Sequence, residues 1–370
     1  MRIPWLVGLV AGVAVVAGAG NASAAVQGYS LGYSSERALT AALARSDGTL
    51  VRRVPALRVA EVRPRGSSLG FQARIACGTG IRYVQPVAPR ASSSVTAAGL
   101  GLEWAYAATH EDAVPEAVQR AAGAFTIAVV DTGADLTAPD LAAKAPASYD
   151  VRTGTSDVSD AIGHGTFVAS IAAGAGTGGG IAGFGGDARL LVVKAAADDG
   201  SFDDVDEASA IVYAVDHGAR IVNLSFAGPH TSAIERNAIA YAAAHGVLLV
   251  AAAGNDAQDG NPVEYPAALL QPSGSDGVGG VGLAVGASDA EGTRAPFSSF
   301  GSYLSLAAPG VSVLGALPSA GSAGAFQTVH LPGSRHGRYG LGSGTSFAAP
   351  QVSGAAAPAT CGAANDVPLA

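Results

Sequence analysis

The stretch Thr126-Ile127-Ala128-Val129-Val130-Asp131-Thr132-Gly133 decides the fold of this chain. It is a short apolar, β-branched run that ends in a carboxylate and a glycine turn, which is typical of a buried parallel strand. Open α/β sheets place their chemistry at the C-terminal ends of such strands. We therefore expect Asp131 to lie at the tip of a central strand, within reach of other functional side chains.

Apolar strands alternate with helical stretches after this first strand. The sequence predicts strands at 190–194, 220–225 and 247–253, and helices at 167–173, 203–216 and 231–245. This alternation predicts an α/β fold with a doubly wound, mostly parallel sheet. The helix at 203–216 begins with an acidic run, which we interpret as capping and solvation rather than metal binding; its members are Asp203, Asp204, Asp206 and Glu207.

A nucleophile is predicted where a glycine-flanked loop becomes an Ala-rich helix, in Ser343-Gly344-Thr345-Ser346-Phe347-Ala348-Ala349-Pro350. A serine at a helix N-terminus lies beside unpaired N–H groups, which favour negative charge on an attacked carbonyl oxygen. Serine alone is a weak nucleophile, so it needs a base. His164, between Gly163 and Gly165, is the candidate base, and Asp131 is the candidate acid that orients it.

The motifs around Asp131, His164 and Ser346, in this order, resemble the active-site motifs of the subtilases, the subtilisin-like serine proteases of peptidase family S8. A fourth match, 251–255, implies that the Asn255 side-chain amide and the Ser346 N–H form the oxyanion hole. The resemblance covers about residues 104–357. Asp-Thr-Gly alone would also fit an aspartic protease, but that class needs a second, pairing motif of the same kind, which this sequence lacks.

The same resemblance implies a substrate cleft. It places Ser225, Phe226, Ala227 and Gly228 on an edge that pairs with extended substrate backbone, and Ala252, Ala253 and Gly254 on the other wall of the P1 pocket. Asp256 and Glu264 fall at the rim and floor of that pocket, where they would favour Lys or Arg in the substrate. A solvated acidic loop is the alternative interpretation of these two residues.

The metal prediction rests on one acidic residue. Asp140 matches a calcium-ligand position of the family, but the facing run 174–183 has Thr177 as its one oxygen-bearing side chain. A calcium ion takes about six to eight oxygen ligands. We therefore predict no required cofactor and no metal ligands at this place, and structural calcium elsewhere in the chain stays open.

Residues 1–24 precede the predicted domains and have the pattern of a secretory signal peptide. An apolar run follows Arg2 and ends before Ala22-Ser23-Ala24, and it is too short for a typical membrane span. The pattern predicts a secreted protein without a stable membrane anchor. Cys77 and Cys361 are too few to predict a disulfide framework.

Residues 25–90 differ in charge from the rest of the chain. They carry ten Lys and Arg against three Asp and Glu, whereas 91–370 carries ten against twenty-six. The pattern predicts strands and helices in the order β-α-β-β-α-β, a ferredoxin-like α+β unit, with strands at 29–33, 49–54, 58–62 and 81–84 and helices at 36–45 and 69–77. It resembles the subtilase propeptide, a temporary inhibitor and folding aid. We expect no nucleic-acid binding, because the arginines are scattered among apolar positions.

The predicted catalytic domain spans 91–357, and the tail 358–370 is unlike the family. Pro358 is expected to stop the helix that carries Ser346. Two interpretations therefore stand. The first is a secreted serine endopeptidase, made as a zymogen and acting on polypeptides. The second is a catalytically incompetent or C-terminally truncated subtilase fold without proteolytic activity.

Overall fold

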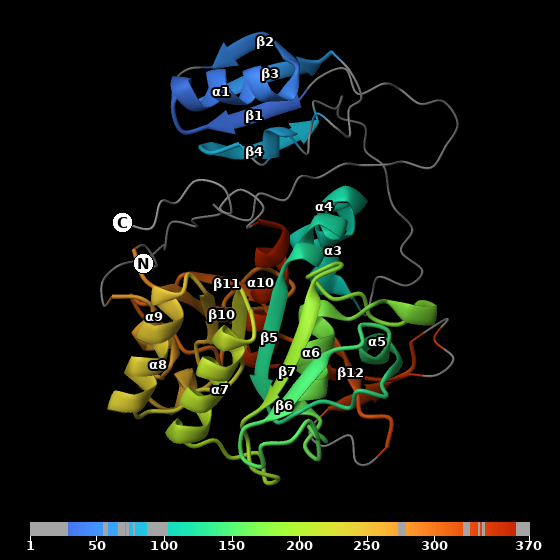
Figure 1. The fold of residues 1–370 in the computed structure, drawn as a ribbon, viewed down its shortest axis with the longest axis vertical. Helices are drawn as coiled ribbons and strands as arrows, with labels where there is room; N and C mark the ends of the chain where they lie inside the picture. The colour runs from blue at the N-terminus through green and yellow to red at the C-terminus, as the bar shows by residue number, and fades with distance from the viewer. Residues whose placement is uncertain are drawn as a thin grey trace. The chain divides into compact units, whose positions relative to one another are not determined.

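The computed structural model in Figure 1 divides into two compact units, which are described separately. The described residues run from Tyr29 to Ala359, with gaps at 55–57, 66–70, 72–73, 77, 87–102, 273–278, 321–325, 332–333 and 335–336. The predicted signal peptide, both cysteines and the tail from 360 onward lie outside the described residues.

The N-terminal unit is built on a four-stranded antiparallel sheet of order β2-β3-β1-β4. Helix α1 (Glu36–Ser46) begins at Ser35, whose hydroxyl accepts the Ala38 N–H. The core of the unit includes Leu31, Leu39 and Phe71. The four predicted strands are confirmed as β1 (Tyr29–Tyr33), β2 (Gly48–Val54), β3 (Val59–Pro64) and β4 (Ile81–Pro86). The second predicted helix is helical at 71 and 74–76, and the rest of it is outside the described residues.

The second unit is built on a seven-stranded sheet of order β11-β10-β9-β8-β5-β7-β6, in which all neighbours are parallel. The order confirms the predicted doubly wound fold, because the chain adds strands first on one side of β5 and then on the other. The strands are β5 (Thr126–Asp131), β6 (Ala147–Asp150), β7 (Arg189–Lys194), β8 (Ile221–Leu224), β9 (Leu248–Ala252), β10 (Gly282–Ser288) and β11 (Leu306–Pro309).

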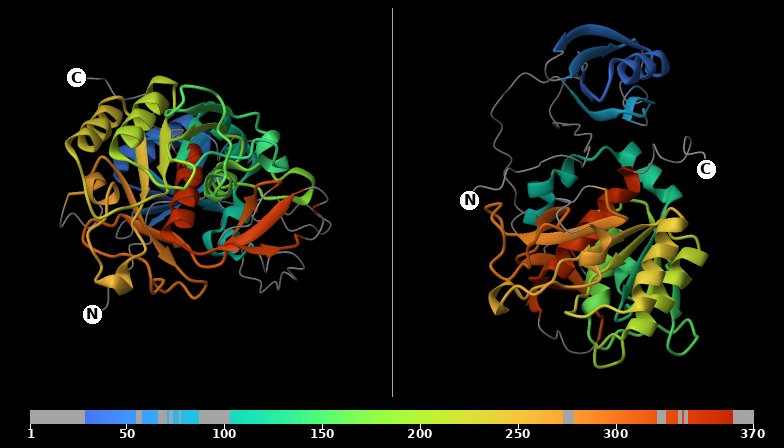
Figure 2. Two further views of the ribbon diagram at one scale, coloured as in Figure 1. Left: turned by 90° about the horizontal axis from the view of Figure 1, so that it is seen from below. Right: turned by 90° about the vertical axis from the view of Figure 1, so that its left-hand side faces the viewer.

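Both faces of this sheet are covered by helices (Figures 1 and 2). Along β5, Ile127 and Val129 pack in the core with α6 (His164–Ala173) and α10 (Thr345–Ala359). Ala128 and Val130 pack in the core on the other face, with the helices α7 (Asp204–Asp216), α8 (Ala233–Ala244) and α9 (Ala267–Leu270). Successive strand residues alternate between faces, so an apolar run such as 127–130 fits a strand that is buried on both sides.

A smaller antiparallel sheet of order β12-β14-β13 packs against α6, where Ala316 N–H donates to Ser170 Oγ at 2.9 Å. No helix among the described residues is long and apolar enough to cross a membrane. The remaining elements are α3 (Trp104–Thr109), α4 (Glu116–Ala121), α5 (Pro139–Ala142), β12 (Val313–Leu317), β13 (Gln327–Val329) and β14 (Arg338–Gly342).

One boundary prediction needs correction. Helix α10 ends at Ala359, one residue beyond Pro358, so this proline lies in the last turn instead of stopping the helix ahead of it. A proline in the last turn removes one backbone N–H donor. The helix can therefore include it and end one residue later.

Candidate active site

Asp131 and His164 form a hydrogen-bonded pair at the C-terminal end of β5. The Asp131 side chain is 0% exposed, and its Oδ1 lies 2.7 Å from His164 Nδ1 and also accepts the Thr132 N–H at 2.8 Å. Asp131 Oδ2 is buried with no hydrogen-bond partner among the described residues. The predicted acid and base are thus brought together from residues 33 positions apart in the chain.

His164 is the first residue of α6, and steric constraints explain why a glycine stands on each side of it. Gly163 has a φ of 87°, which favours glycine. A Cβ on Gly165 would overlap the Gly133 carbonyl oxygen, so a side chain there would separate the start of α6 from the turn after β5. Close packing of the two turns is what lets the His164 ring reach the carboxylate.

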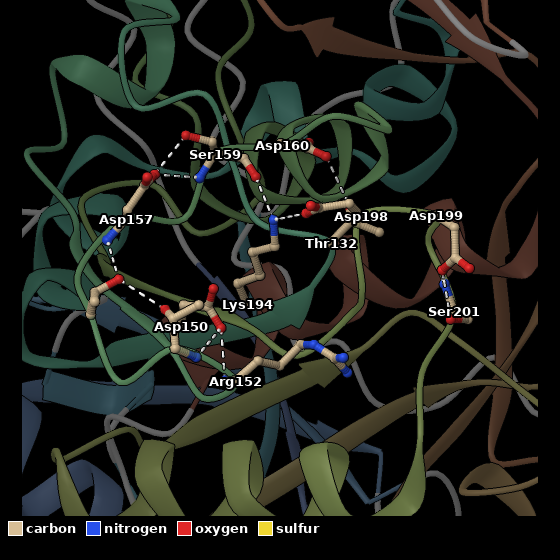
Figure 3. Close-up of polar contacts among 12 residues, drawn as sticks. Thr132, Asp150, Arg152, Asp157, Ser159, Asp160, Lys194, Asp198, Asp199 and Ser201 are labelled. Carbon is tan, nitrogen blue, oxygen red and sulfur yellow. Dashed lines mark hydrogen bonds and ion pairs between the residues drawn. The ribbon is translucent and has the colours of Figure 1, made fainter.

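Asp160, which the sequence analysis did not identify, fixes the loop before His164. Its Oδ1 accepts from Thr132 Oγ1 and the Gly163 N–H, both at 2.8 Å, and Figure 3 shows the contact with Thr132. Its Oδ2 accepts from the Thr166 N–H at 2.8 Å and from the Thr166 hydroxyl at 2.6 Å. This single carboxylate therefore caps α6 and ties it to the residue after Asp131.

Lys194, at the end of β7, holds the same loop through hydrogen bonds (Figure 3). Its Nζ donates to the Ser159 carbonyl at 2.8 Å and to Asp198 Oδ1 at 3.1 Å. Asp157 Oδ1 accepts the Ser159 N–H at 3.0 Å. Because β7 pairs with β5, the loop that carries Asp160 is anchored to the strand beside Asp131.

The surroundings of His164 change its acidity. Its side chain is 24% exposed, and burial by itself lowers the pKa. The charge and hydrogen bond of Asp131, with the charge of Asp160, outweigh burial and raise the pKa of His164 above its ordinary value. The ring is thus a base only above that raised pKa. Asp131 on the Nδ1 side leaves Nε2 as the nitrogen that can accept a proton.

Ser346 is the second residue of α10 and is half-buried. The ring of Phe347, the next residue, lies 5.5 Å from the His164 ring between centroids, so the starts of α6 and α10 are neighbours. Pro350 has no N–H to offer the Ser346 carbonyl in the helix. That carbonyl accepts instead from the Ser225 hydroxyl at 2.8 Å, which anchors the first turn of α10 to the end of β8.

Asn255 contacts the start of α10. Its Oδ1 accepts the Thr345 N–H at 2.9 Å, and Thr345 Oγ1 in turn accepts the Gly254 N–H at 3.1 Å. Asn255 itself is exposed. With its oxygen held by the helix, the amide presents its NH2 group as the donor.

The predicted substrate edge lies along a cleft of about 820 Å³ that His164 also lines. Ser225, Phe226, Ala227 and Gly228 are all part of its wall. Gly228 already pairs with Tyr265 in an antiparallel bridge, with N–H to O distances of 3.0 and 2.8 Å. The edge is thus held in an extended conformation by its neighbour.

The predicted P1-pocket residues are close to one another. Ala252 and Ala253 are buried at the end of β9. The Glu264 side chain lies directly against Gly254, because a Cβ on that glycine would overlap its carboxylate. Glu264 is 3% exposed and accepts the Ser299 hydroxyl at 2.5 Å. Burial and then the charge of the exposed Asp256 raise the pKa of Glu264, against the hydrogen bond from Ser299.

The Asp140 carboxylate is surrounded by hydrogen-bond donors rather than by further oxygen acceptors. Oδ1 accepts the Thr177 N–H at 2.9 Å, and Oδ2 accepts the Ile181 N–H at 3.1 Å and the Tyr339 hydroxyl at 3.0 Å. N–H donors repel a cation, and calcium needs several oxygens directed at it. These residues therefore do not fit a calcium ion.

Three supporting residues were missed by the sequence analysis: Asp160, Lys194 and Thr345. The available signal for Asp160 was an acidic residue three positions before a glycine N-cap. Lys194 was visible only as a charge at the end of an apolar strand, and Thr345 as a hydroxyl before the first helical turn. None of these sequence patterns shows which residue the side chain will bond in the folded protein.

The site is an Asp–His pair at the tip of a doubly wound sheet, beside a serine at a helix start, which is the arrangement of an α/β serine hydrolase. Residues 123–366 match the model of the Subtilase family. The chain therefore belongs to the subtilases.

Similar proteins agree with this family. The chain is 37% identical to the "Thermophilic serine proteinase" of Bacillus sp. (strain AK1), over 62% of this chain and 51% of that protein. It is 34% identical to fervidolysin of Fervidobacterium pennivorans, over 62% of this chain and 34% of that protein. The chain thus spans about half of the first relative's length and about a third of the second's.

Solved structures support the fold. The crystal structure of fervidolysin, described as a keratinolytic enzyme related to subtilisin, has a TM-score of 0.60 at 26% identity, covering 92% of this chain and 55% of that one. A cold-adapted subtilisin-like serine proteinase has a TM-score of 0.51 at 26% identity, covering 64% of this chain and 75% of that one.

Replacing Asp160 by Asn should lower the pKa of His164, because it removes one of the charges that raise it. The measurement is an NMR titration of the His164 ring, which does not depend on activity. Asp157→Asn is the matched control, since this acid bonds Ser159 in the same loop but does not act on His164. A pKa that moves equally in both variants would contradict the role given to Asp160.

Proposed function

We propose that this chain is a secreted serine endopeptidase, made as a zymogen, that hydrolyses peptide bonds of polypeptides. The observation that supports it most is the hydrogen bond between His164 and the buried Asp131 carboxylate, next to the helix start that carries Ser346. Family membership points to the same class of reaction. The proposed catalytic residues are Asp131, His164 and Ser346.

The proposed reaction proceeds through an acyl-enzyme. Ser346 Oγ attacks the peptide carbonyl carbon while His164 Nε2 takes its proton, and Asp131 stabilises the resulting imidazolium. The Asn255 NH2 group and the Ser346 N–H donate to the oxyanion. His164 then gives the proton to the leaving amine, and water attacks the acyl-enzyme by the same route in reverse. These steps use no metal ion or cofactor.

A fluorophosphonate probe should label the processed enzyme, from which residues 25–90 have been removed, at Ser346, since the probe reports an activated serine whatever the substrate preference. Ser346→Ala should abolish labelling. Asn255→Ala should fold normally and lower kcat by about 100- to 1,000-fold, because one oxyanion donor is lost. Absence of labelling in folded, processed protein would favour the alternative, a subtilase fold without proteolytic activity.

The second part of the proposal concerns residues 25–90 as the enzyme's own inhibitor. Support comes from their basic balance against the acidic 91–370 and from the separate hydrophobic core of the N-terminal unit. Opposite charges promote association and raise its rate. We propose that this unit blocks the cleft until it is cleaved off.

Adding a 25–90 peptide to the processed enzyme should inhibit hydrolysis at low salt. The inhibition constant should rise as sodium chloride is raised from about 0.02 M to about 0.5 M, because salt screens exposed charges. A circular dichroism spectrum of the peptide alone checks that it is folded. A folded peptide that does not inhibit at low salt would reject the proposal.

We further propose that the enzyme prefers Lys or Arg at P1 of its substrate, because the Glu264 and Asp256 carboxylates attract a cationic side chain. Replacing Glu264 by Gln keeps the shape of the side chain and a polar contact to Ser299. It should lower kcat/KM for a P1-Arg substrate by about tenfold, about 1.4 kcal/mol, and leave a P1-Leu substrate unchanged or improved. Equal losses on both substrates would show that Glu264 supports the Gly254 turn and does not contact the substrate.

A further inference from the structure

The helix α10 that carries Ser346 contains a proline, Pro350, in its second turn. Proline has no N–H, so the carbonyl four residues before it, that of Ser346, has no helical donor. The Ser225 hydroxyl donates to this carbonyl at 2.8 Å instead. The position of the Ser346 turn therefore depends on whatever holds the Ser225 hydroxyl in its orientation.

Two buried side chains stand behind Ser225, and both are 0% exposed. The first is Asn223 on β8, whose Nδ2 lies 2.8 Å from Ser225 Oγ. The second is Ser353 on α10, whose Oγ lies 2.9 Å from Asn223 Oδ1. Ser353, Asn223 and Ser225 thus form a continuous row of hydrogen bonds that ends at the Ser346 carbonyl. We call these three side chains the buried row.

The chemistry of the groups fixes the direction of every hydrogen bond in the buried row. A backbone carbonyl can only accept, so the Ser225 hydroxyl must donate to Ser346. Ser225 Oγ then accepts from the Asn223 NH2 group, which turns the amide oxygen of Asn223 toward Ser353. The Ser353 hydroxyl donates to that oxygen. Ser353 therefore sets the orientation of the Asn223 amide, and through it that of the Ser225 hydroxyl.

The buried row joins two parts of the same helix across its proline. Ser353 follows Ser346 by about two helical turns, so both residues lie on the face of α10 that contacts β8. The hydrogen bonds leave α10 at Ser353, pass through Asn223 and Ser225, and return to α10 at Ser346. They replace the support that the helix lacks at Pro350. The first turn of α10 is thus held to both β8 and the later part of the helix.

Asn223 is the only polar residue of β8 (Ile221–Leu224), and its three neighbours in that strand are buried and apolar. An apolar side chain at this position would suit the core equally well. Buried polar groups contribute little net stability, because hydrogen bonds in the fold replace those to water. A fully bonded buried network instead restricts the core to one arrangement. The arrangement that this network selects is the one that fixes the Ser346 turn.

We propose that Asn223 and Ser353 are positioning residues for the nucleophile, and that they act through Ser225 on the first turn of α10. The inference rests on the proposed function, in which the Ser346 hydroxyl attacks the substrate and the Ser346 N–H binds the oxyanion. Neither Asn223 nor Ser353 is part of the wall of the cleft that His164 lines. Their effect on the reaction is therefore indirect, through the placement of Ser346.

The test compares the processed wild-type enzyme with Ser353→Ala, Ser225→Ala and the double variant. A displacement of about 1 Å at a reacting atom can slow a reaction about 100-fold, so the smaller shift in Ser353→Ala should lower kcat and the rate of fluorophosphonate labelling by about three- to tenfold. KM should stay within about twofold, because the change affects the attack more than substrate binding. The acid limb of the pH profile should not move, because Asp131 and Asp160 still act on His164.

Ser225→Ala should lower kcat at least as much as Ser353→Ala, because it removes the last member of the buried row. Adding Ser353→Ala to Ser225→Ala should then cause less than about a twofold further loss of kcat, because residues that act as a unit are not additive. The matched control is Ser170→Ala. The Ser170 hydroxyl is also 0% exposed, and its hydrogen bonds to the Phe167 carbonyl and from the Ala316 N–H lie outside α10. This control should lower Tm but leave kcat and labelling unchanged.

The outcomes separate the positioning role from the proposed function. An unchanged kcat in either folded single variant would overturn the positioning role and leave the protease proposal intact. The same conclusion would follow from an equal loss of kcat in Ser170→Ala, or from additive losses in the double variant. Failure of the folded, processed wild-type protein to be labelled would overturn the protease proposal and with it the positioning role.

Discussion

The hydrogen bond between Asp131 and His164 is the interaction on which the rest of the site depends. A carboxylate at 0% exposure is stable as an anion only with donors around it, and His164 supplies one of the two that Oδ1 receives. The glycine at 165 lets the start of α6 approach closely enough for that bond. Asp160 then holds the helix start to Thr132, so the imidazole is fixed from two sides.

Ser346 is also positioned by a small number of specific hydrogen bonds. Its helix is fastened at the first turn by Thr345 to Asn255, and by the Ser346 carbonyl to Ser225. The second contact is available because Pro350 leaves that carbonyl without its helical partner. A proline that would weaken an ordinary helix thus gives this one an attachment to β8. The serine is therefore held by the sheet rather than by helix propensity.

The sequence was sufficient for the parallel sheet, and it predicted that Asp131 would end a strand and that His164 and Ser346 would lie at helix starts, as they do. The apolar, β-branched run 126–130 is typical of a buried strand, and the glycines around His164 are typical of a tight turn. Long-range pairings were not predictable in this way. Three interactions join residues that are far apart in the chain and follow no sequence pattern. They are the hydrogen bonds from Tyr339 to Asp140 and from Lys194 to the Ser159 carbonyl, and the charge interaction between Glu235 and Glu207.

The acids of α7 and α8 show the limit of a purely local explanation. A helix N-terminus stabilises a nearby carboxylate by about 0.3–1 kcal/mol when it is exposed, and by up to about 2 kcal/mol when it is partly buried. Burying an unpaired carboxylate costs several kcal/mol. The helix dipoles therefore cannot by themselves explain why Glu207 and Glu235 are both almost fully buried. In the free protein the raised pKa of Glu207 relieves part of that cost by holding a proton, whereas a bound cation would relieve it by pairing with the charge.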